Sequence, residues 1–221
     1  VEGGFDLPPV YGSLATFVRA GIGGFEGRAL VDGDVLPVVT DAVDRRPEVV
    51  LATPSFLAAE GPIRIVLGPQ DDFFTAASID RFFSSEFVVG AAVDRMGMRL
   101  EGPAFEHSRG HDIISDGIAL GAIQVPGNGQ PIILLADHQT TGGYPKVGTV
   151  ISSDVHRLGR LRPGQSVRFE RISAADGERQ ARAAETDLQT IFRQITTAGP
   201  QLDLGRLQDS NLISGVVLAG A

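Results

Sequence analysis

GAIQVPGNGQPIILLADHQTTGGYPK, residues 121–146, joins an uninterrupted apolar run to flanking glycines and polar side chains, which no other part of the 221-residue chain does. Residues 132–136 are too few to cross a membrane and have the length of a strand buried on both faces. Before them, residues 126–129 favour a tight turn, because glycine and asparagine tolerate positive φ and proline presets the first turn torsion. The sequence therefore predicts a hairpin over residues 124–131 that leads into a central strand.

A polar segment follows this strand, and we interpret it as a candidate site. Its glycines, Gly142 and Gly143, would let backbone amides approach a ligand. Lys146 ends the segment and is the only lysine among the 19 basic residues. In so arginine-rich a chain, a lysine suggests that a compact ammonium charge, rather than a planar guanidinium, is needed there. A solvated lysine after a loop is the alternative, and composition does not decide between the two.

Composition bounds the class of protein. A content of 43% hydrophobic and 21% charged residues is ordinary for a globular domain. The formal net charge of -8 disfavours a nucleic-acid partner, which needs a basic surface. We find no apolar run of membrane-spanning length and no secretory signal pattern, so we expect a cytoplasmic protein without a membrane partner. The absence of cysteine excludes disulfides, thiolate zinc sites and a cysteine nucleophile.

Strand patterns outnumber helix patterns, which predicts a mainly β, barrel-like fold. Two segments with internal turns, 29–39 and 161–172, are each expected to form a hairpin. Other strands are expected at 63–67, 87–93, 99–101, 113–115, 118–125 and 149–151.

Two helices are expected among these strands. Thr75 is a candidate N-cap for a short helix near 75–84, whose apolar residues recur at helical spacing. The same spacing predicts a long helix near 175–197, with Ser173 or Asp176 as its cap and Gly-Pro at 199–200 as its stop. The apolar end of the chain, 212–221, is expected to add an edge strand or to pack on a partner.

Four further motifs indicate local structure or chemistry less specifically. The glycines of 21–28 resemble a dinucleotide loop, but Glu26 stands at the third required glycine, so a turn is expected. Asp94 and Arg95 lie at a turn, where a surface salt bridge is the plain interpretation and an arginine presented to an anionic ligand is the alternative.

The other two motifs concern metal binding and hydrolysis. His107 and His111 have a spacing seen in metal sites, but the loop composition opposes the helix that would place both imidazoles on one side, and no metal site is predicted. Ser13 and Ser214 lie beside glycine without forming a nucleophile elbow, so a Ser-His-Asp mechanism is not indicated.

Eight phrases, taken in order along the chain, match one protein family. They are GGFDLPPVYGS (3–13), GIGGFEGRAL with DGDVLPV (21–38), GPQDDFF (68–74), DRMGMRLEGP (94–103), IISDGI (113–118), GAIQVPGNGQPI (121–132), QTTGGYPK (139–146) and NLISGVV (211–217). Together they resemble the allophanate hydrolase subunit 2 family, also called KipA or the 5-oxoprolinase C subunit, which includes part of the carboxyltransferase domain of urea carboxylase. The family's usual N-terminal portion is absent, so residues 1–221 are expected to be the C-terminal two thirds of a subunit 2 domain.

The resemblance implies a cyclophilin-like β-barrel in a complex with a subunit 1 (KipI-like) partner. In the 5-oxoprolinase setting, which is our main hypothesis, the two subunits use ATP to activate the lactam of 5-oxoproline, and a third protein completes hydrolysis of the C–N bond. In the urea carboxylase setting, the domain moves a carboxyl group from carboxybiotin to urea. A non-catalytic kinase regulator of the KipA type is the third possibility. The chain has no P-loop and no biotin-acceptor phrase, so ATP or biotin would be shared with other polypeptides.

Both reactions activate a planar, amide-like substrate, and the candidate site offers matching groups. The catalytic candidates, which would neutralise or hydrogen-bond an oxyanion, are Lys146, Gln139, Thr140 and Thr141. The substrate-binding candidates are Gln124, Asn128, Gln130, Gly142, Gly143, Tyr144, Arg95 and Arg99. Amide side chains beside strands are often structural, so part of this list is expected to be scaffold. We expect the 139–146 loop to face a cleft together with the 124–130 turn, with the Lys146 ammonium directed toward the ligand.

Overall fold

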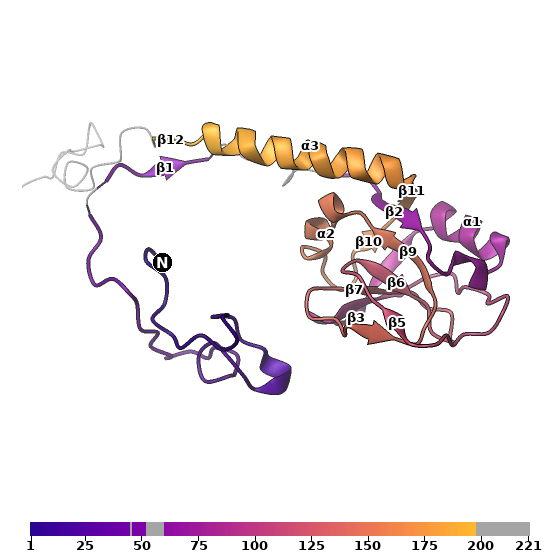
Figure 1. Ribbon diagram of the computed structural model, residues 1–221, viewed down its shortest axis with the longest axis horizontal. Helices are drawn as coiled ribbons and strands as arrows, with labels where there is room; N and C mark the ends of the chain where they lie inside the picture. The colour runs from indigo at the N-terminus through magenta and orange to yellow at the C-terminus, as the bar shows by residue number, and fades with distance from the viewer. Residues whose placement is uncertain (45, 52–59, 198–221) are drawn as a thin grey trace, which may run out of the picture. The chain divides into compact units, whose positions relative to one another are not determined.

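The computed structural model describes residues 1–44, 46–51 and 60–197 (Figure 1). Internal contacts divide the chain into two units, one of residues 1–48 together with 197–221, and one of residues 49–196. The predicted helix stop at 199–200 and the apolar segment 212–221 lie outside the described residues. No helix in the described part of the chain is both long and apolar enough to cross a membrane.

The N-terminal unit consists of turns, isolated bridges and one 3-10 helix, η1 (Val18–Ala20), over its described residues. The glycine-rich segment 21–28 forms turns, as predicted. The hairpin predicted over 29–39 is wrong, since Val38 pairs only in an isolated bridge with Phe5.

Side-chain hydrogen bonds explain why the 29–39 segment forms no ladder. Arg28 donates to both carboxylate oxygens of Asp34 at 2.8 Å, and Asp34 also accepts the backbone N–H of Val31 at 2.7 Å. The Arg28 hydrogen bond lowers the pKa of Asp34 to about 2. These local bonds satisfy the backbone in a turn and compete with strand pairing.

The second unit is built on one eight-stranded sheet with the order β10-β3-β4-β7-β6-β9-β2-β11. Its strands are β2 (Ile63–Leu67), β3 (Phe87–Val93), β4 (Gly97–Glu101), β6 (Ala122–Gln124), β7 (Ile132–Leu134), β9 (Lys146–Val150), β10 (Ser166–Val167) and β11 (Phe169–Arg171). Two small sheets pair β1 (Val49–Val50) with β12 (Thr196–Thr197), and β5 (Asp116–Gly117) with β8 (Thr141–Gly142).

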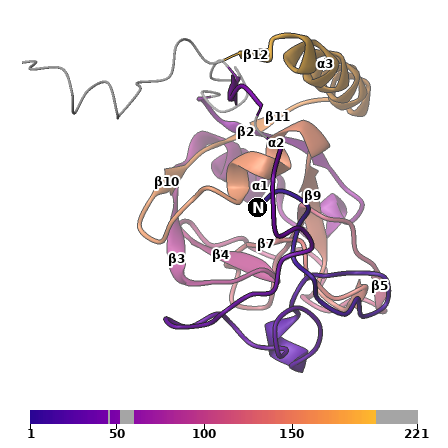
Figure 2. The same ribbon diagram turned by 90° about the vertical axis from the view of Figure 1, so that its left-hand side faces the viewer.

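The chain around Arg168 closes the sheet into a barrel. Val167 in β10 pairs antiparallel with Phe87 of β3, whereas Phe169 in β11 pairs parallel with Ile63 of β2. Because β10 and β11 are consecutive in the chain and lie at opposite ends of the strand order, the sheet curves back on itself (Figure 2). The mainly β, barrel-like prediction is therefore confirmed.

The same pairing corrects the hairpin predicted over 161–172. The turn at 163–164 forms, but the two strands that follow it pair with β3 and β2 instead of with each other. Val167 and Phe169 are both buried in the closed barrel. An isolated two-stranded hairpin would leave these side chains exposed to water.

The 121–146 stretch folds much as expected. β6 and β7 form the predicted hairpin, with Gln124 opposite Ile132, and β7 lies between β4 and β6 near the middle of the sheet. The central strand is shorter than predicted, ending at Leu134, and the strand predicted at 113–115 is displaced to β5.

Helix caps follow the sequence closely. Helix α1 (Ala76–Ser84) begins after Thr75, whose hydroxyl accepts the Ser78 N–H at 3.2 Å. Helix α3 (Ala174–Arg193) begins after Ser173, which accepts the Asp176 N–H at 3.1 Å, and it ends before the predicted position because Thr196 and Thr197 form β12.

Two short helical elements were not predicted. They are the 3-10 helix η3 (Asp71–Phe73) and helix α2 (Ser152–Leu158). Seven residues are too few to display a helical period clearly, so α2 is difficult to recognise by spacing.

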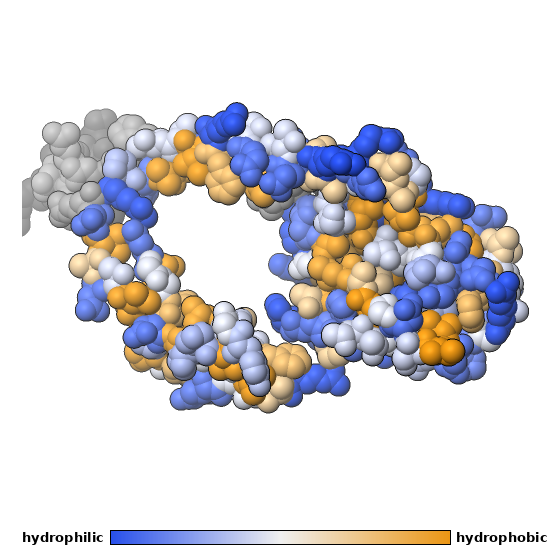
Figure 3. Space-filling view, in the orientation of Figure 1, coloured by the Kyte–Doolittle hydropathy of each residue, from blue (hydrophilic) through white to orange (hydrophobic). Residues whose placement is uncertain are grey.

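Aromatic rings from separate elements fill the barrel interior. Phe82 of α1 stacks on Phe169 of β11 with ring centroids 4.6 Å apart and meets Phe87 of β3 edge-on at 5.2 Å. In contrast, Phe192 on α3 is 60% exposed, and the segment that carries α3 shows hydrophobic and hydrophilic side chains together (Figure 3). The apolar residues of α1 therefore pack in the core, whereas the last turns of α3 do not.

Replacement of matched phenylalanines tests this assignment. We expect Phe169→Ala to lower the free energy of unfolding by about 3–5 kcal/mol, because it leaves a cavity at the point of barrel closure. Phe192→Ala is the control and should change it by less than about 0.5 kcal/mol, as is usual for surface positions. Denaturant unfolding measures both, and equal losses would contradict the assignment.

Candidate functional site

A β-bulge on β9 places Lys146 inside the barrel wall. Ile123 pairs with Gly148 and Gln124 pairs with Lys146, so Val147 is an extra residue on β9. Lys146 and Val147 are consequently both buried, although alternate strand residues normally point to opposite faces. Gly148 allows the close approach of β2, because a Cβ there would lie 2.7 Å from Ile65 Cγ2.

The buried ammonium of Lys146 has a carboxylate partner. Its Nζ donates to Asp116 Oδ2 at 3.0 Å, with the Lys146 side chain 3% exposed and the Asp116 side chain 51% exposed. Gln70 Nε2 donates to the same oxygen at 3.1 Å, and the Gly117 N–H donates to Oδ1 at 2.8 Å. The hydrogen bond from Lys146, followed by those from Gln70 and Gly117, holds the pKa of Asp116 below its usual value.

A second pair of amides lies beside the lysine. Gln124 is buried, and its Oε1 accepts a hydrogen bond from Gln139 Nε2 at 3.4 Å. Among the residues that the structure describes, Gln124 Nε2 has no hydrogen-bond partner although it is buried. Because an unsatisfied buried N–H is costly, this atom is suited to donate to a ligand oxygen.

Strands β5 and β8 bring the two pairs together. Asp116 is the register partner of Gly142, and a Cβ at Gly142 would lie 2.6 Å from Gln124 Nε2. Gln124 is in turn the register partner of Lys146. The cluster of Gln70, Asp116, Gln124, Gln139, Gly142 and Lys146, which we call the lysine cluster, therefore presents a cation, a carboxylate and a free amide donor side by side.

The rest of the 139–146 loop surrounds this cluster. Thr140 and Thr141 are exposed, and their backbone anchors the loop: the Thr140 carbonyl accepts the Ile118 N–H at 3.0 Å. The Gly143 carbonyl accepts the Ile113 N–H at 2.8 Å, and Tyr144 is 41% exposed. Hydroxyl or backbone contact of these residues with a ligand stays a prediction.

Two of the predicted binding residues lie in the turn of the β6–β7 hairpin, which begins directly after Gln124. Asn128 Oδ1 accepts the Gln130 N–H at 3.1 Å, and Gln130 Nε2 donates to the Gly102 carbonyl at 3.2 Å. The structure thus joins Gln124 to the 139–146 loop. Asn128 and the Gln130 Nε2 make turn contacts, whereas Gln130 Oε1 is buried without a hydrogen-bond partner among the described residues.

The two predicted arginines also lie in other settings. Arg95 does not pair with Asp94; it makes a two-point contact with Asp137 at 2.7 and 2.9 Å, which raises the pKa of Arg95. Asp94 instead accepts the N–H groups of the turn that follows it. Arg99 is exposed on β4 between two buried residues, so it lies on the outer face of the sheet.

The histidine pair has structural contacts as well. His107 Nε2 is 3.2 Å from the Val125 carbonyl, and His111 lies 3.3 Å from Asp112. Within the described ranges, no group of three or more His, Asp or Glu side chains is placed to hold a metal ion.

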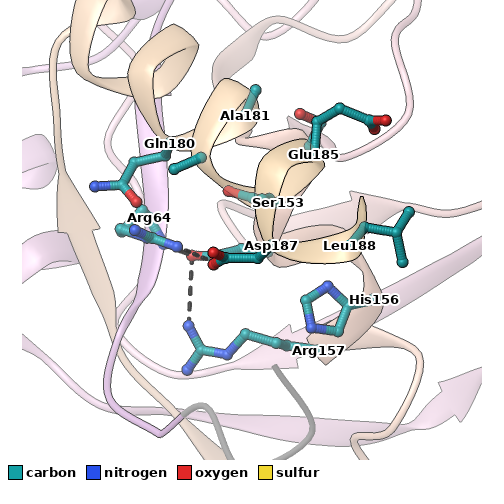
Figure 4. A pocket seen from close by; sticks show the side chains of 13 residues that line it. Arg64, Ser153, His156, Arg157, Gln180, Ala181, Glu185, Asp187 and Leu188 are labelled. Carbon is teal, nitrogen blue, oxygen red and sulfur yellow. Dashed lines mark hydrogen bonds and ion pairs between the residues drawn. The ribbon is translucent and has the colours of Figure 1, made fainter. Parts of the chain in front are cut away.

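A groove between α2 and α3 contains a second buried ion pair (Figure 4). Arg64 donates to Asp154 at 2.6 and 3.0 Å, and Arg157 lies 3.4 Å from the same carboxylate. Burial raises the pKa of Asp154, but the Arg64 hydrogen bonds outweigh it and hold the pKa below its usual value. The arginines are thereby engaged in tying α2 to β2, and none of the predicted site residues lines this groove.

The barrel is that of a carboxyltransferase-type domain. The family described as carboxyltransferase domain, subdomain A and B, matches residues 1–171, and the chain belongs to it. This confirms the resemblance found in the sequence, and α3 lies beyond the matched residues.

Three similar proteins illustrate the relationship. The chain is 38% identical over 195 residues to the C subunit of 5-oxoprolinase from Escherichia coli, an alignment that covers 88% of this chain and 61% of the relative. It is 30% identical over 194 residues to the urea amidolyase of Saccharomyces cerevisiae, covering 78% of this chain and 10% of that one. The crystal structure of the K. lactis urea amidolyase superposes with a TM-score of 0.73 at 25% identity, covering 88% of this chain and 14% of that one. The chain thus spans about six tenths of the length of the 5-oxoprolinase subunits it matches.

Sequence reasoning missed two members of the lysine cluster, Asp116 and Gln70. Both stand in phrases that carried the family resemblance, IISDGI and GPQDDFF, and this is the signal that could have indicated them. Their sequence separations from Lys146, 30 and 76 residues, hide the contacts from any local pattern.

A pair of adjacent glycines tests the geometry of the cluster. Gly142→Ala should displace the Gln124 amide, because the added Cβ would lie 2.6 Å from Nε2. Gly143→Ala is the control, since its nearest contact, the Ile113 carbonyl, is at 3.4 Å. Amide side-chain signals in NMR spectra should shift for Gln124 in the first variant only; an unmoved Gln124 signal in Gly142→Ala would contradict the packing described.

Proposed function

We propose that this chain is the component of an ATP-dependent 5-oxoprolinase complex that corresponds to its C subunit, in a hydrolase acting on a C–N bond. The observation that carries the proposal is the lysine cluster, in which the Lys146 ammonium, the Asp116 carboxylate and the unpartnered Gln124 Nε2 lie together. The likeness to the C subunits of the 5-oxoprolinases of E. coli and Haemophilus influenzae, at 38% and 37% identity, supports it.

A lactam matches the hydrogen-bonding groups of the cluster. Its ring holds the C=O and N–H on the same edge of the amide, so it offers one acceptor and one donor side by side. Gln124 Nε2 would donate to the carbonyl oxygen, and the Asp116 carboxylate would accept from the ring N–H. The Lys146 ammonium would neutralise negative charge that develops on the oxygen as the carbonyl is attacked.

The flanking residues would shape and close this site. Gln139 orients Gln124, and the absence of a Cβ at Gly142 leaves room for the amide. The hydroxyls of Thr140 and Thr141, the Gly143 amide and the Tyr144 side chain would cover the ligand from the 139–146 loop. Of the remaining candidates, Arg95 and Arg99 would have to act from outside the cluster, so we assign them no step.

ATP and the other subunits complete the proposal. The sequence has no P-loop, so ATP would be bound mainly by, or shared with, a subunit 1 (KipI-like) homologue, and a third protein would complete ring opening. We place the complex in the cytoplasm. Activity would require assembly, because this chain supplies only one part of the catalytic machinery.

A carboxyltransferase of the urea carboxylase type is the second candidate. Urea also presents C=O and N–H groups on one edge, and the family match and the likeness to urea amidolyases favour such a transfer. The higher identity to 5-oxoprolinase subunits leads us to prefer the lactam reaction. In the second reaction the carboxyl group would arrive on a biotin carried by another polypeptide.

Substitution of the single lysine tests the proposal in the assembled complex. Lys146→Met should reduce 5-oxoproline-dependent turnover by about 10²–10³-fold, the usual cost of removing an oxyanion-stabilising group. Lys146→Arg should also impair turnover while leaving the protein folded, because a guanidinium fork does not replace a point charge in a fitted site. Arg162→Met, at an exposed turn, is the matched control and should be neutral.

Two results would contradict the proposal. One is wild-type turnover in Lys146→Met. The other is a purified complex that transfers a carboxyl group from carboxybiotin to urea but shows no ATP hydrolysis stimulated by 5-oxoproline, which would favour the second candidate.

A further inference from the structure

The loop 68–70 is fixed to β9 by an extension of the β2–β9 ladder. The last residue pair of the β2–β9 ladder is Leu67 with Gly148. One residue further along the chain, the Gly68 N–H donates to the Val147 carbonyl at 3.1 Å. The Gln70 N–H then donates to the Lys146 carbonyl, also at 3.1 Å. The backbone of Gln70 is therefore held directly beside the backbone of the buried lysine.

The Gln70 side chain links both partners of the ion pair. Its Oε1 accepts the Lys146 N–H at 3.1 Å, and its Nε2 donates to Asp116 Oδ2 at 3.1 Å. The same Asp116 oxygen accepts the Lys146 ammonium. One amide thus contacts the main chain of the cation and the carboxylate of the anion, and its two ends cannot be exchanged, because only Nε2 can donate to a carboxylate.

We propose that Gln70 is a positioning residue that holds the Asp116 carboxylate against the Lys146 ammonium. The inference rests on the proposed function of the lysine cluster. Gln70 need not touch the substrate; it fixes the direction of the groups that do.

The weak support of Asp116 from its own segment explains why such a residue is needed. Asp116 lies on β5, a strand of only two residues, and its side chain is 51% exposed. An ion pair with an exposed partner gains little by itself, since water competes for the charge and side-chain entropy opposes a single geometry. A third group with a fixed backbone removes much of that freedom.

The arrangement also fixes which oxygen faces the lysine. Oδ1 is held by the Gly117 N–H, and Oδ2 receives both Gln70 and Lys146. Without Gln70 the carboxylate keeps Gly117 as an anchor but can rotate its other oxygen away from the ammonium. Since a misplacement of about 1 Å can cost up to about 100-fold in rate, turnover should be sensitive to this contact.

Two variants of Gln70 disrupt its contacts in different ways. Gln70→Met keeps the chain length and removes both side-chain hydrogen bonds, whereas Gln70→Glu keeps an acceptor for the Lys146 N–H but places a second carboxylate against Asp116. The matched control is Gln165→Met, which removes a glutamine whose Oε1 accepts the Arg162 N–H at 2.7 Å in a turn outside the lysine cluster.

The only lysine of the chain provides a direct readout. Lysine-specific ¹⁵N and ¹³C labelling gives one side-chain signal, that of Lys146, which can be followed in this protein within the assembled complex. We expect both Gln70 variants to shift this signal, and kcat for 5-oxoproline to fall by about 10- to 100-fold with little change in KM. Gln165→Met should leave the signal and kcat at wild-type values, and thermal melts would confirm that all three variants are folded.

The outcomes are distinguishable from those of the proposed function. A Lys146 signal and a kcat in folded Gln70→Met that match wild type would overturn the positioning role while leaving the lysine assignment in place. If the signal shifts but Gln70→Met and Lys146→Met both keep wild-type turnover, the proposed function falls, and the positioning role falls with it. A loss of kcat in Gln70→Met equal to that in Gln165→Met would also overturn it, because the effect would then be a general one.

Discussion

Barrel closure at residues 166–171 is the constraint on which the second unit depends. Val167 pairs with β3 and Phe169 with β2, so a single short segment joins the two ends of the strand order. Closing the barrel buries Phe169 against Phe82 and Phe87, and this contact brings α1 into the same core. With the ends joined, the curvature of the sheet and the neighbours of β9 are determined.

The position of the lysine cluster follows from that curvature and from one extra residue. The bulge at Val147 allows Lys146 to be buried next to Gln124, and the continuation of the β2–β9 ladder places Gln70 beside it. A buried ammonium is costly unless it is paired, and Asp116 supplies the partner from a separate two-stranded sheet. The site is thus assembled from four segments, each fixed by backbone pairing, with its polar groups turned toward one another.

Local patterns in the sequence were sufficient for much of the fold. The hairpin before β7 and the cap of α1 by Thr75 depend on neighbouring residues, and the sequence predicted both. For α3 it indicated Ser173 or Asp176 as the cap, and the structure has Ser173. The pairing of β10 and β11 with distant strands does not depend on neighbouring residues. It could not be predicted, because pairing with a local strand or with a distant strand satisfies the same alternation of buried and exposed residues. For the site, the unusual single lysine was recognisable, but Asp116 and Gln70 required contacts across 30 and 76 residues.

We propose that the lysine cluster receives the substrate of an assembled 5-oxoprolinase-type complex. The most direct measurement is a titration of 5-oxoproline into that complex while the Lys146 side-chain signal is followed, since the chain has one lysine and the assignment is unambiguous. If the cluster receives the substrate, the Lys146 signal should show a saturable shift whose midpoint agrees with the substrate concentration that half-saturates turnover. A Lys146 signal that stays unchanged at concentrations of 5-oxoproline that saturate turnover would contradict it.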